Sequence, residues 1–295
     1  TNADGTITRD VVTYTYDAYG RVNSQTTIRT NADSTVLTEV TTYEYDAFGR
    51  LSRQITDRSS EGNPSSTQVI TYTYDAFGRM SQQNVQTTVH GAQGAIVSTD
   101  VTTYTYDNFG RVSQQITESH RAGDNSTYIN TTAYTYDQYG RVLTVNTESR
   151  KQIPGQAAEI SLDLTTYAYD QFGRVASLRT NHTNADGSKS IIDTVYTYDQ
   201  YGRVKITDQA THQIVGEYDG DGIEGDDVVT RTVTENTYDN LGRLSHTKAT
   251  IYKEGVSAPE IKDQDFTYDD YGQVVIGNNN NTNPDNTNTH GNTSY

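Results

Sequence analysis

One alternation of hydrophobic and polar positions recurs along almost the whole chain. In its first copy Tyr14 and Tyr16 alternate with threonines, which is the period-two pattern of a β-strand with rings on one face and hydroxyls on the other. The next four residues, Asp17 to Gly20, predict a turn, because a leading aspartate accepts backbone N–H groups and a closing glycine can take a positive φ. A return strand then begins at Arg21. Each copy therefore predicts one antiparallel β-hairpin.

The pattern occurs nine times as Tyr-x-Tyr-Asp-x-(Tyr/Phe)-Gly-Arg-(Val/Leu/Met), at spacings of 29 to 40 residues. Its aspartates are Asp17, Asp46, Asp75, Asp107, Asp137, Asp170, Asp199, Asp239 and Asp269. The eighth copy departs at Asn236 and Leu241, and the ninth at Phe266 and Gln273. Decay of a motif at one end of an array is typical of a terminal repeat.

The segments between the motifs are rich in Gly, Asp, Asn or Pro and predict a second set of turns. A unit of about thirty residues with two turns leaves two strands of ~10 residues each, so nine units predict about 18 strands. A flat sheet of that size is disfavoured, because strand twist accumulates. We expect an all-β fold of repeated long antiparallel hairpins that form one continuous coiled sheet over residues 1–276. Residues 277–295 are expected to be a polar low-complexity tail or linker.

Composition narrows the function classes. Only 32% of the residues are hydrophobic, which is too few for a thick core. The net charge of -16 argues against nucleic acid as a partner, and no apolar run approaches membrane-spanning length. Without cysteine there is no disulfide, thiolate metal site or cysteine nucleophile. The 24 tyrosines and 48 threonines favour half-exposed sheet.

From Tyr14 to Val274 the motif resembles the tyrosine–aspartate (YD) repeat of Rhs proteins, teneurins and encapsulating components of bacterial toxin complexes. The resemblance implies hairpins joined into a spiralling sheet that encloses a hollow cocoon or forms an extracellular scaffold. The repeats are longer than those of that family, and neither a self-cleaving core motif nor a toxin-like domain is visible. Residues 1–6 match the tips at 30–35 and 183–188, which predicts that the chain is a segment of a longer array.

Residues 217–227, here called the acidic segment, lie in the longest spacing and alternate carboxylates with glycines. This composition suits a hard cation such as calcium, and the segment is similar to thrombospondin type 3 calcium loops. The candidate ligands are Asp219, Asp221, Asp226 and Asp227. A solvated acidic hairpin tip is the alternative. The segment also matches Gly-x-Gly-x-x-Gly, but an acidic loop with no following helix does not suit a dinucleotide.

No catalytic constellation appears, so a non-enzymatic protein with no required cofactor is expected. The motif aspartate is expected to hold its turn, and the arginine to lie over a neighbouring ring or pair with a neighbouring aspartate. Six histidines lack metal-ligand spacing, and His90, His120, His182 and His212 are expected to be solvated near the variable tips. Five Asn-x-Ser/Thr sequons leave glycosylation open.

Three functions remain. The leading hypothesis is an extracellular or cell-surface structural protein, a segment of a fibre, stalk or scaffold whose partners are other copies or neighbouring repeats of a longer chain. The alternatives are part of an Rhs-type shell around a downstream toxin domain, and a carbohydrate-binding adhesin with the variable tips as contact loops.

Overall fold

The computed structural model describes residues 9–31, 33, 35–60, 63–91, 94–123, 125–214, 228–285 and 287–294. These residues form strands and turns without a helix, and a search among them for an apolar helix of membrane-spanning length found none. The chain divides into two compact units. The first comprises Thr1–Ala133 and Glu148–Ile160, and the second comprises Tyr134–Thr147 and Ser161–Tyr295. The prediction of an all-β chain of repeated hairpins is confirmed.

The first nine strands are eight to thirteen residues long. They are β1 (Arg9–Tyr16), β2 (Val22–Thr30), β3 (Val36–Tyr45), β4 (Leu51–Ser60), β5 (Asn63–Tyr74), β6 (Met80–Gly91), β7 (Gly94–Tyr106), β8 (Val112–Arg121) and β9 (Ser126–Tyr136). The later strands are β10 (Val142–Gln152), β11 (Glu159–Tyr169), β12 (Val175–Thr183), β13 (Lys189–Tyr198), β14 (Val204–Ile214), β15 (Val228–Tyr238), β16 (Leu244–Lys253), β17 (Glu260–Tyr268), β18 (Val274–Thr282) and β19 (Asn288–Ser294).

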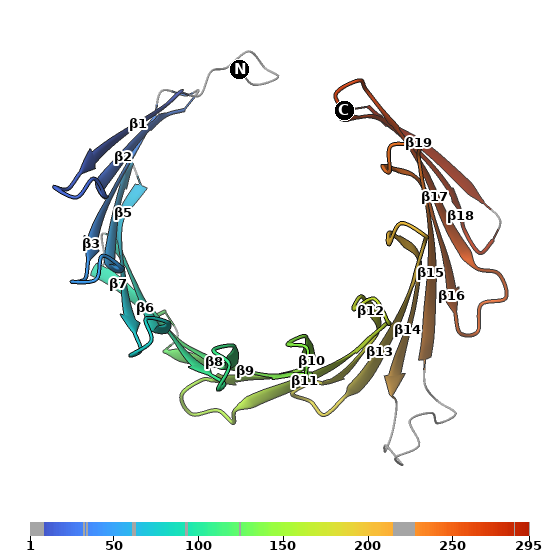
Figure 1. Cartoon of the computed structure of the whole chain (residues 1–295), viewed down its shortest axis with the longest axis horizontal. Coiled ribbons are helices and arrows are strands. Elements are labelled where there is room, and N and C mark those ends of the chain that lie inside the picture. The colour runs from blue at the N-terminus through green and yellow to red at the C-terminus, as the bar shows by residue number, and fades with distance from the viewer. Residues whose placement is uncertain are drawn as a thin grey trace. The chain divides into compact units, whose positions relative to one another are not determined.

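Sequence neighbours are also sheet neighbours. From β1 to β9, and again from β11 to β19, each strand pairs antiparallel with the next strand along the chain. Within each unit the successive strands follow a curve and do not lie in one plane, as expected for a twisted sheet of many strands (Figure 1). Because these pairings are local, the described strands of a repeat pair with those of the repeats before and after it in the same unit.

A β-bulge marks the motif end of the eight hairpins whose register is described. Between β1 and β2 the register shifts from Thr15 opposite Ser24 to Tyr16 opposite Val22. The backbone N–H of Gly20 donates to the Asp17 carbonyl at 3.1 Å, and Gly20 has a φ of 78°. This geometry is a type I turn closed by a glycine bulge, as the sequence predicts.

The sheet has almost no apolar core. Among the described residues, Ile191 is the one buried hydrophobic side chain, at 5% exposure. The other buried side chains are polar, and two of them, Thr41 and Thr56, share a hydroxyl hydrogen bond of 3.1 Å. Stability must therefore come from the strand ladder and from contacts that recur in every repeat.

The segment expected to be a tail from residue 277 onward differs from that expectation, because it completes β18 and supplies β19. The two strands are joined by a turn in which the side-chain amide of Asn283 donates to Thr287 Oγ1 at 2.9 Å and Thr287 N–H donates to Asp285. The same Asn-x-Asp-x-(Ser/Thr) turn links β2 to β3 and β12 to β13. A polar strand pairs here because the ladder requires backbone groups and not apolar side chains.

Candidate functional site

The repeated motif turn carries the densest side-chain chemistry in the protein, and the second repeat shows its parts. Asp46 Oδ1 accepts the backbone N–H groups of Phe48 and Arg50, both at 2.9 Å. Asp46 Oδ2 accepts from Arg50 Nε at 2.7 Å. One carboxylate thus fixes both the backbone of the turn and the arginine that leaves it. The same contacts recur at Asp17, Asp75, Asp107, Asp137, Asp170, Asp199 and Asp239.

These contacts change the acidity of the aspartate. Desolvation acts to raise the pKa of Asp46, but the hydrogen bonds from the backbone and side chain of Arg50 and from the Phe48 backbone lower that pKa overall. In the ninth repeat the backbone bond to Asp269 is kept, but Gln273 replaces the arginine. The turn therefore holds a carboxylate that already accepts three hydrogen bonds and whose pKa is lowered, which makes it a weak general base.

The arginine of each turn connects two repeats. The Arg50 guanidinium carbon lies 4.9 Å from the ring centroid of Phe48 in its own turn and 4.2 Å from that of Tyr74 in the next repeat. The guanidinium thus makes a cation–π contact with each of the two rings. Paired rings also flank Arg21, Arg79, Arg141, Arg174 and Arg203. The expected contact with a neighbouring ring is present, and the ion pair is made to the aspartate of the same turn.

The second tyrosine of each motif adds a hydrogen bond between repeats. The Tyr74 hydroxyl donates to the Leu51 carbonyl at 2.7 Å, one repeat earlier. Equivalent bonds of 2.6–2.8 Å are made by Tyr45, Tyr106, Tyr169, Tyr198, Tyr238 and Tyr268. Together with the arginine contacts they form what we call the turn ladder, which joins successive repeats within each unit.

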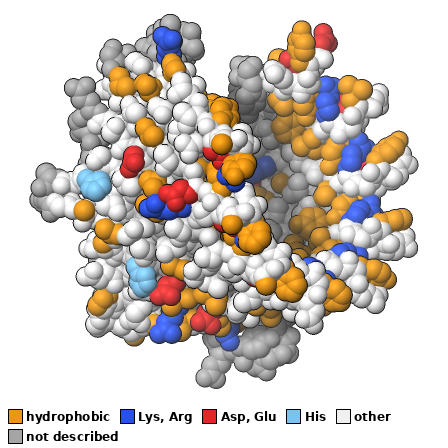
Figure 2. Space-filling model, turned by 60° about the vertical axis from the view of Figure 1, so that its left-hand side comes forward, with side chains coloured by type: hydrophobic (Ala, Val, Ile, Leu, Met, Phe, Trp, Pro, Cys, Tyr) orange, Lys and Arg blue, Asp and Glu red, His pale blue; other side chains and the backbone are white. Residues whose placement is uncertain are grey.

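The third ring of the motif is left in solvent. Side chains at this position are 72–91% exposed in every repeat. They are Tyr19, Phe48, Phe77, Phe109, Tyr139, Phe172, Tyr201, Leu241 and Tyr271. In the space-filling view, hydrophobic side chains project from the surface beside basic ones (Figure 2). Most rings at this position contact the arginine of their own turn, but most of their surface stays in water, which is unusual for a large apolar residue at one fixed position.

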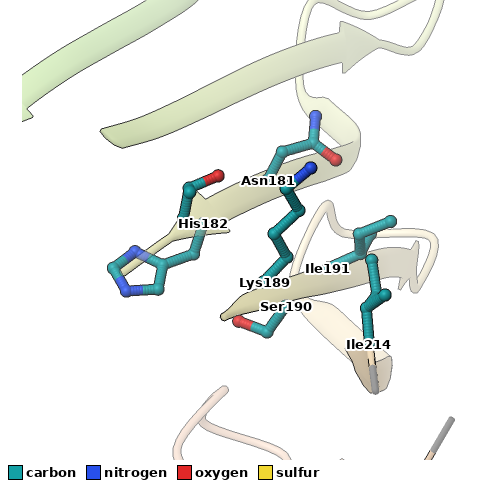
Figure 3. A pocket seen from close by; sticks show the side chains of 7 residues that line it. Asn181, His182, Lys189, Ser190, Ile191 and Ile214 are labelled. Atoms are coloured by element: carbon teal, nitrogen blue, oxygen red, sulfur yellow. The ribbon is translucent and has the colours of Figure 1, made fainter. Parts of the chain in front are cut away.

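A shallow pocket of about 260 Å³ lies on β12, β13 and β14 (Figure 3). Asn181, Ile191 and Ile214 point to one side of the sheet, and His182 points to the other. His182 Nδ1 is bonded to Asp163, and Nε2 is 2.7 Å from Asn184 Oδ1. His182 was expected to be a solvated loop residue, but it lies within β12 in this network.

The hydrogen bonds to Asp163 and then to Asn184 raise the pKa of His182. With an acceptor at each ring nitrogen, the imidazolium form, which donates from both nitrogens, fits the site best. No ring nitrogen is left to take a proton from a nucleophile, so this arrangement is a charge pair across two strands. Asp163 and His182 are 19 residues apart, and sequence reasoning missed the pair because it depends on the register that places them opposite each other.

The four calcium candidates of the acidic segment, Asp219, Asp221, Asp226 and Asp227, lie outside the described residues. Within the part of the chain that the structure describes, no three His, Asp or Glu side chains come together in a way that could hold a metal ion. Calcium binding by the acidic segment therefore stays a prediction.

A scan against protein-family models found no match, and no curated protein matches the chain. Among solved structures, TcdB2–TccC3 aligns at 12% identity over 96% of this chain and 24% of its own, with a TM-score of 0.19. The form of TcdB2–TccC3 without its hypervariable C-terminal region aligns at 11% identity over 90% and 24%, with a TM-score of 0.19. A porin-like protein from Bacteroides vulgatus ATCC 8482 aligns at 13% identity over 78% and 94%, with a TM-score of 0.29. The chain thus spans 24% of TcdB2–TccC3, and similarities of this degree assign no activity or partner to it.

Proposed function

We propose that this protein is a non-enzymatic structural repeat protein, a segment of an extracellular fibre, stalk or scaffold built from YD-type repeats. The turn ladder is the observation that carries the proposal. It places the same aspartate, arginine and tyrosine contacts in repeat after repeat. A chain that uses its recurring side-chain chemistry to join successive repeats within each unit is organised for mechanical continuity.

The distribution of charged groups supports this role. The motif carboxylates are occupied by backbone and guanidinium donors, and both ring nitrogens of His182 are engaged. A catalytic site needs one repeat to differ from the rest, with a titratable group free to exchange a proton. The motif aspartates of the first eight repeats do not differ in this way.

Equivalence of the repeats can be tested directly. Asp46→Asn, Asp107→Asn and Asp199→Asn each remove the charge of one turn, in the second, fourth and seventh repeats. We expect the three variants to lower the melting temperature by similar amounts. A variant that leaves the melting temperature unchanged while its counterparts lower it would show a specialised repeat and would contradict the scaffold role.

Location and assembly need a second experiment. Antibodies against the purified protein should label the outside of intact producing cells by immunogold electron microscopy, with permeabilised cells as the control. Label confined to the cell interior would exclude the extracellular role. Closed hollow particles containing a separate cargo polypeptide would favour the alternative, an encapsulating shell.

A further inference from the structure

The exposed third ring of the motif differs between the two units in its immediate neighbour. In the first three repeats the preceding residue is an exposed alanine, Ala18, Ala47 or Ala76. The fifth, sixth and seventh repeats have glutamine at the same position. In these repeats the exposed side chain therefore has an apolar neighbour in the first unit and a polar neighbour in the second, and in the fourth repeat the neighbour is Asn108.

The exposed side chains at this motif position in the first unit are also more exposed than most of those in the second unit. Tyr19, Phe48, Phe77 and Phe109 are 83–84% exposed, and three of the four have no hydroxyl with which to bind water. We call these four rings and the three alanines the apolar row. Four side chains of this kind at 83–84% exposure offer roughly 500–850 Å² of contact area, close to the ~800 Å² that each partner contributes to a standard interface.

Spacing limits what can cover the apolar row. Successive rings belong to hairpins two strands apart, which places them ~9.6 Å from each other. Three of the four rings follow an alanine, which is shorter than the glutamine of the second unit, and Phe109 follows Asn108. The arginine of each turn lies against its own ring and approaches the glycine of the next turn, so the gap between neighbouring rings lies at their outer parts, which are 83–84% exposed. A partner with the same period, offset by half a repeat, can insert one ring into each gap, and a second copy of this chain has that period.

Charge permits the approach. Each turn of the apolar row carries one aspartate and one arginine, paired with each other at 2.6–2.7 Å. The row itself is therefore neutral although the chain carries -16. Two copies can meet here without direct like-charge contacts, and the repulsion between their remaining charges is long-range and screened by salt.

We propose that the apolar row is a self-association surface through which two copies of this protein pair about a two-fold axis with their rings interdigitated. The row of the second unit stays in water. This inference deepens the proposed scaffold role and rests on it, because it names the partner that such a scaffold uses. If pairing fails while the chain folds with an intact turn ladder, the scaffold role stands and this surface alone is refuted.

Sedimentation velocity over a concentration series tests the proposal. The wild-type protein should show a concentration-dependent dimer that strengthens with added salt. The double variant Phe48→Ser/Phe77→Ser should weaken the dimer by at least roughly tenfold. The matched control Phe172→Ser/Tyr201→Ser removes two rings from the second unit and should leave the dimer unchanged. Circular dichroism and thermal melting confirm that both variants fold.

Cysteine cross-linking provides an independent readout, since the natural chain has no cysteine. A mixture of Ala47→Cys and Ala76→Cys copies should form disulfide dimers on mild oxidation. A mixture of Gln171→Cys and Gln200→Cys copies should not. A monomeric wild type at all concentrations, equal weakening by both double variants, or equal cross-linking of both mixtures would overturn the proposal.

Discussion

The tyrosine hydroxyls of the turn ladder can be removed without disturbing the rings. Tyr45→Phe, Tyr74→Phe and Tyr106→Phe each delete one hydrogen bond of 2.6–2.8 Å to a backbone carbonyl and leave the ring where the preceding arginine contacts it. A hydrogen bond of this kind contributes ~1 kcal/mol net to the free energy of unfolding. Its removal should cost at least that much, because the half-buried carbonyl is left without its donor. The three sites are ~9.6 Å apart along the sheet, so their effects should add to about 3 kcal/mol.

The triple variant should unfold at a lower urea concentration than the wild type, and its melting temperature should fall by roughly 5 °C or more. Hydrogen exchange should locate the weakening in β2 to β7, because a repeat array opens locally. The control is Tyr19→Phe/Tyr139→Phe/Tyr201→Phe, which deletes three hydroxyls from rings that are 74–84% exposed and should change stability very little. Equal stability of the two triple variants would refute the view that the tyrosine hydroxyls join the repeats.

Other parts of the molecule give further predictions. Gly78→Ala should destabilise the protein more than Gly20→Ala, although both glycines have a positive φ. A Cβ added at Gly78 lies 3.3 Å from Arg50 Nη1, whereas a Cβ added at Gly20 meets nothing within 4 Å. Thermal melting of the two variants tests this difference. The motif aspartates, such as Asp75, have a lowered pKa in the folded protein and therefore stabilise it. This stabilisation is present above the unfolded-state pKa of ~3.9 and is lost as the pH falls through the pKa of the folded state. Acid unfolding followed by circular dichroism should therefore be steep, and an unchanged melting temperature down to about pH 2 would contradict it. The raised pKa of His182 gives the opposite pH dependence of stability. Its stabilising contribution is complete below the unfolded-state pKa of ~6.5 and is lost as the pH rises through the pKa of the folded state. His182→Asn should therefore be most destabilising near pH 5 and nearly neutral near pH 9. Calorimetry with calcium should show binding of modest affinity to the acidic segment, and absence of heat or an unchanged melting temperature on chelation would count against it.

The buried residues explain why stability is expected to be distributed. A globular domain concentrates its apolar burial in one core, whereas here Ile191 is the one buried hydrophobic residue among those described. Most repeats instead contribute a guanidinium in contact with two rings, a tyrosine hydroxyl on a carbonyl and a carboxylate-bound turn. Loss of one such set should weaken its neighbourhood and leave distant repeats folded.

The sequence by itself determined the hairpins and their turns. Alternation fixes which side chains share a face, and only glycine readily accepts the positive φ seen at Gly20, so both features are local and appear in the order of residues. The polar composition of residues 277–295 also predicted a tail or linker, but Asn283 and Thr287 close another turn in this segment. Tertiary structure decided which groups meet across strands. The contact of Arg50 with Tyr74, the bond from Tyr74 to Leu51 and the pairing of Asp163 with His182 all join residues on different strands, and one step of register would separate each pair.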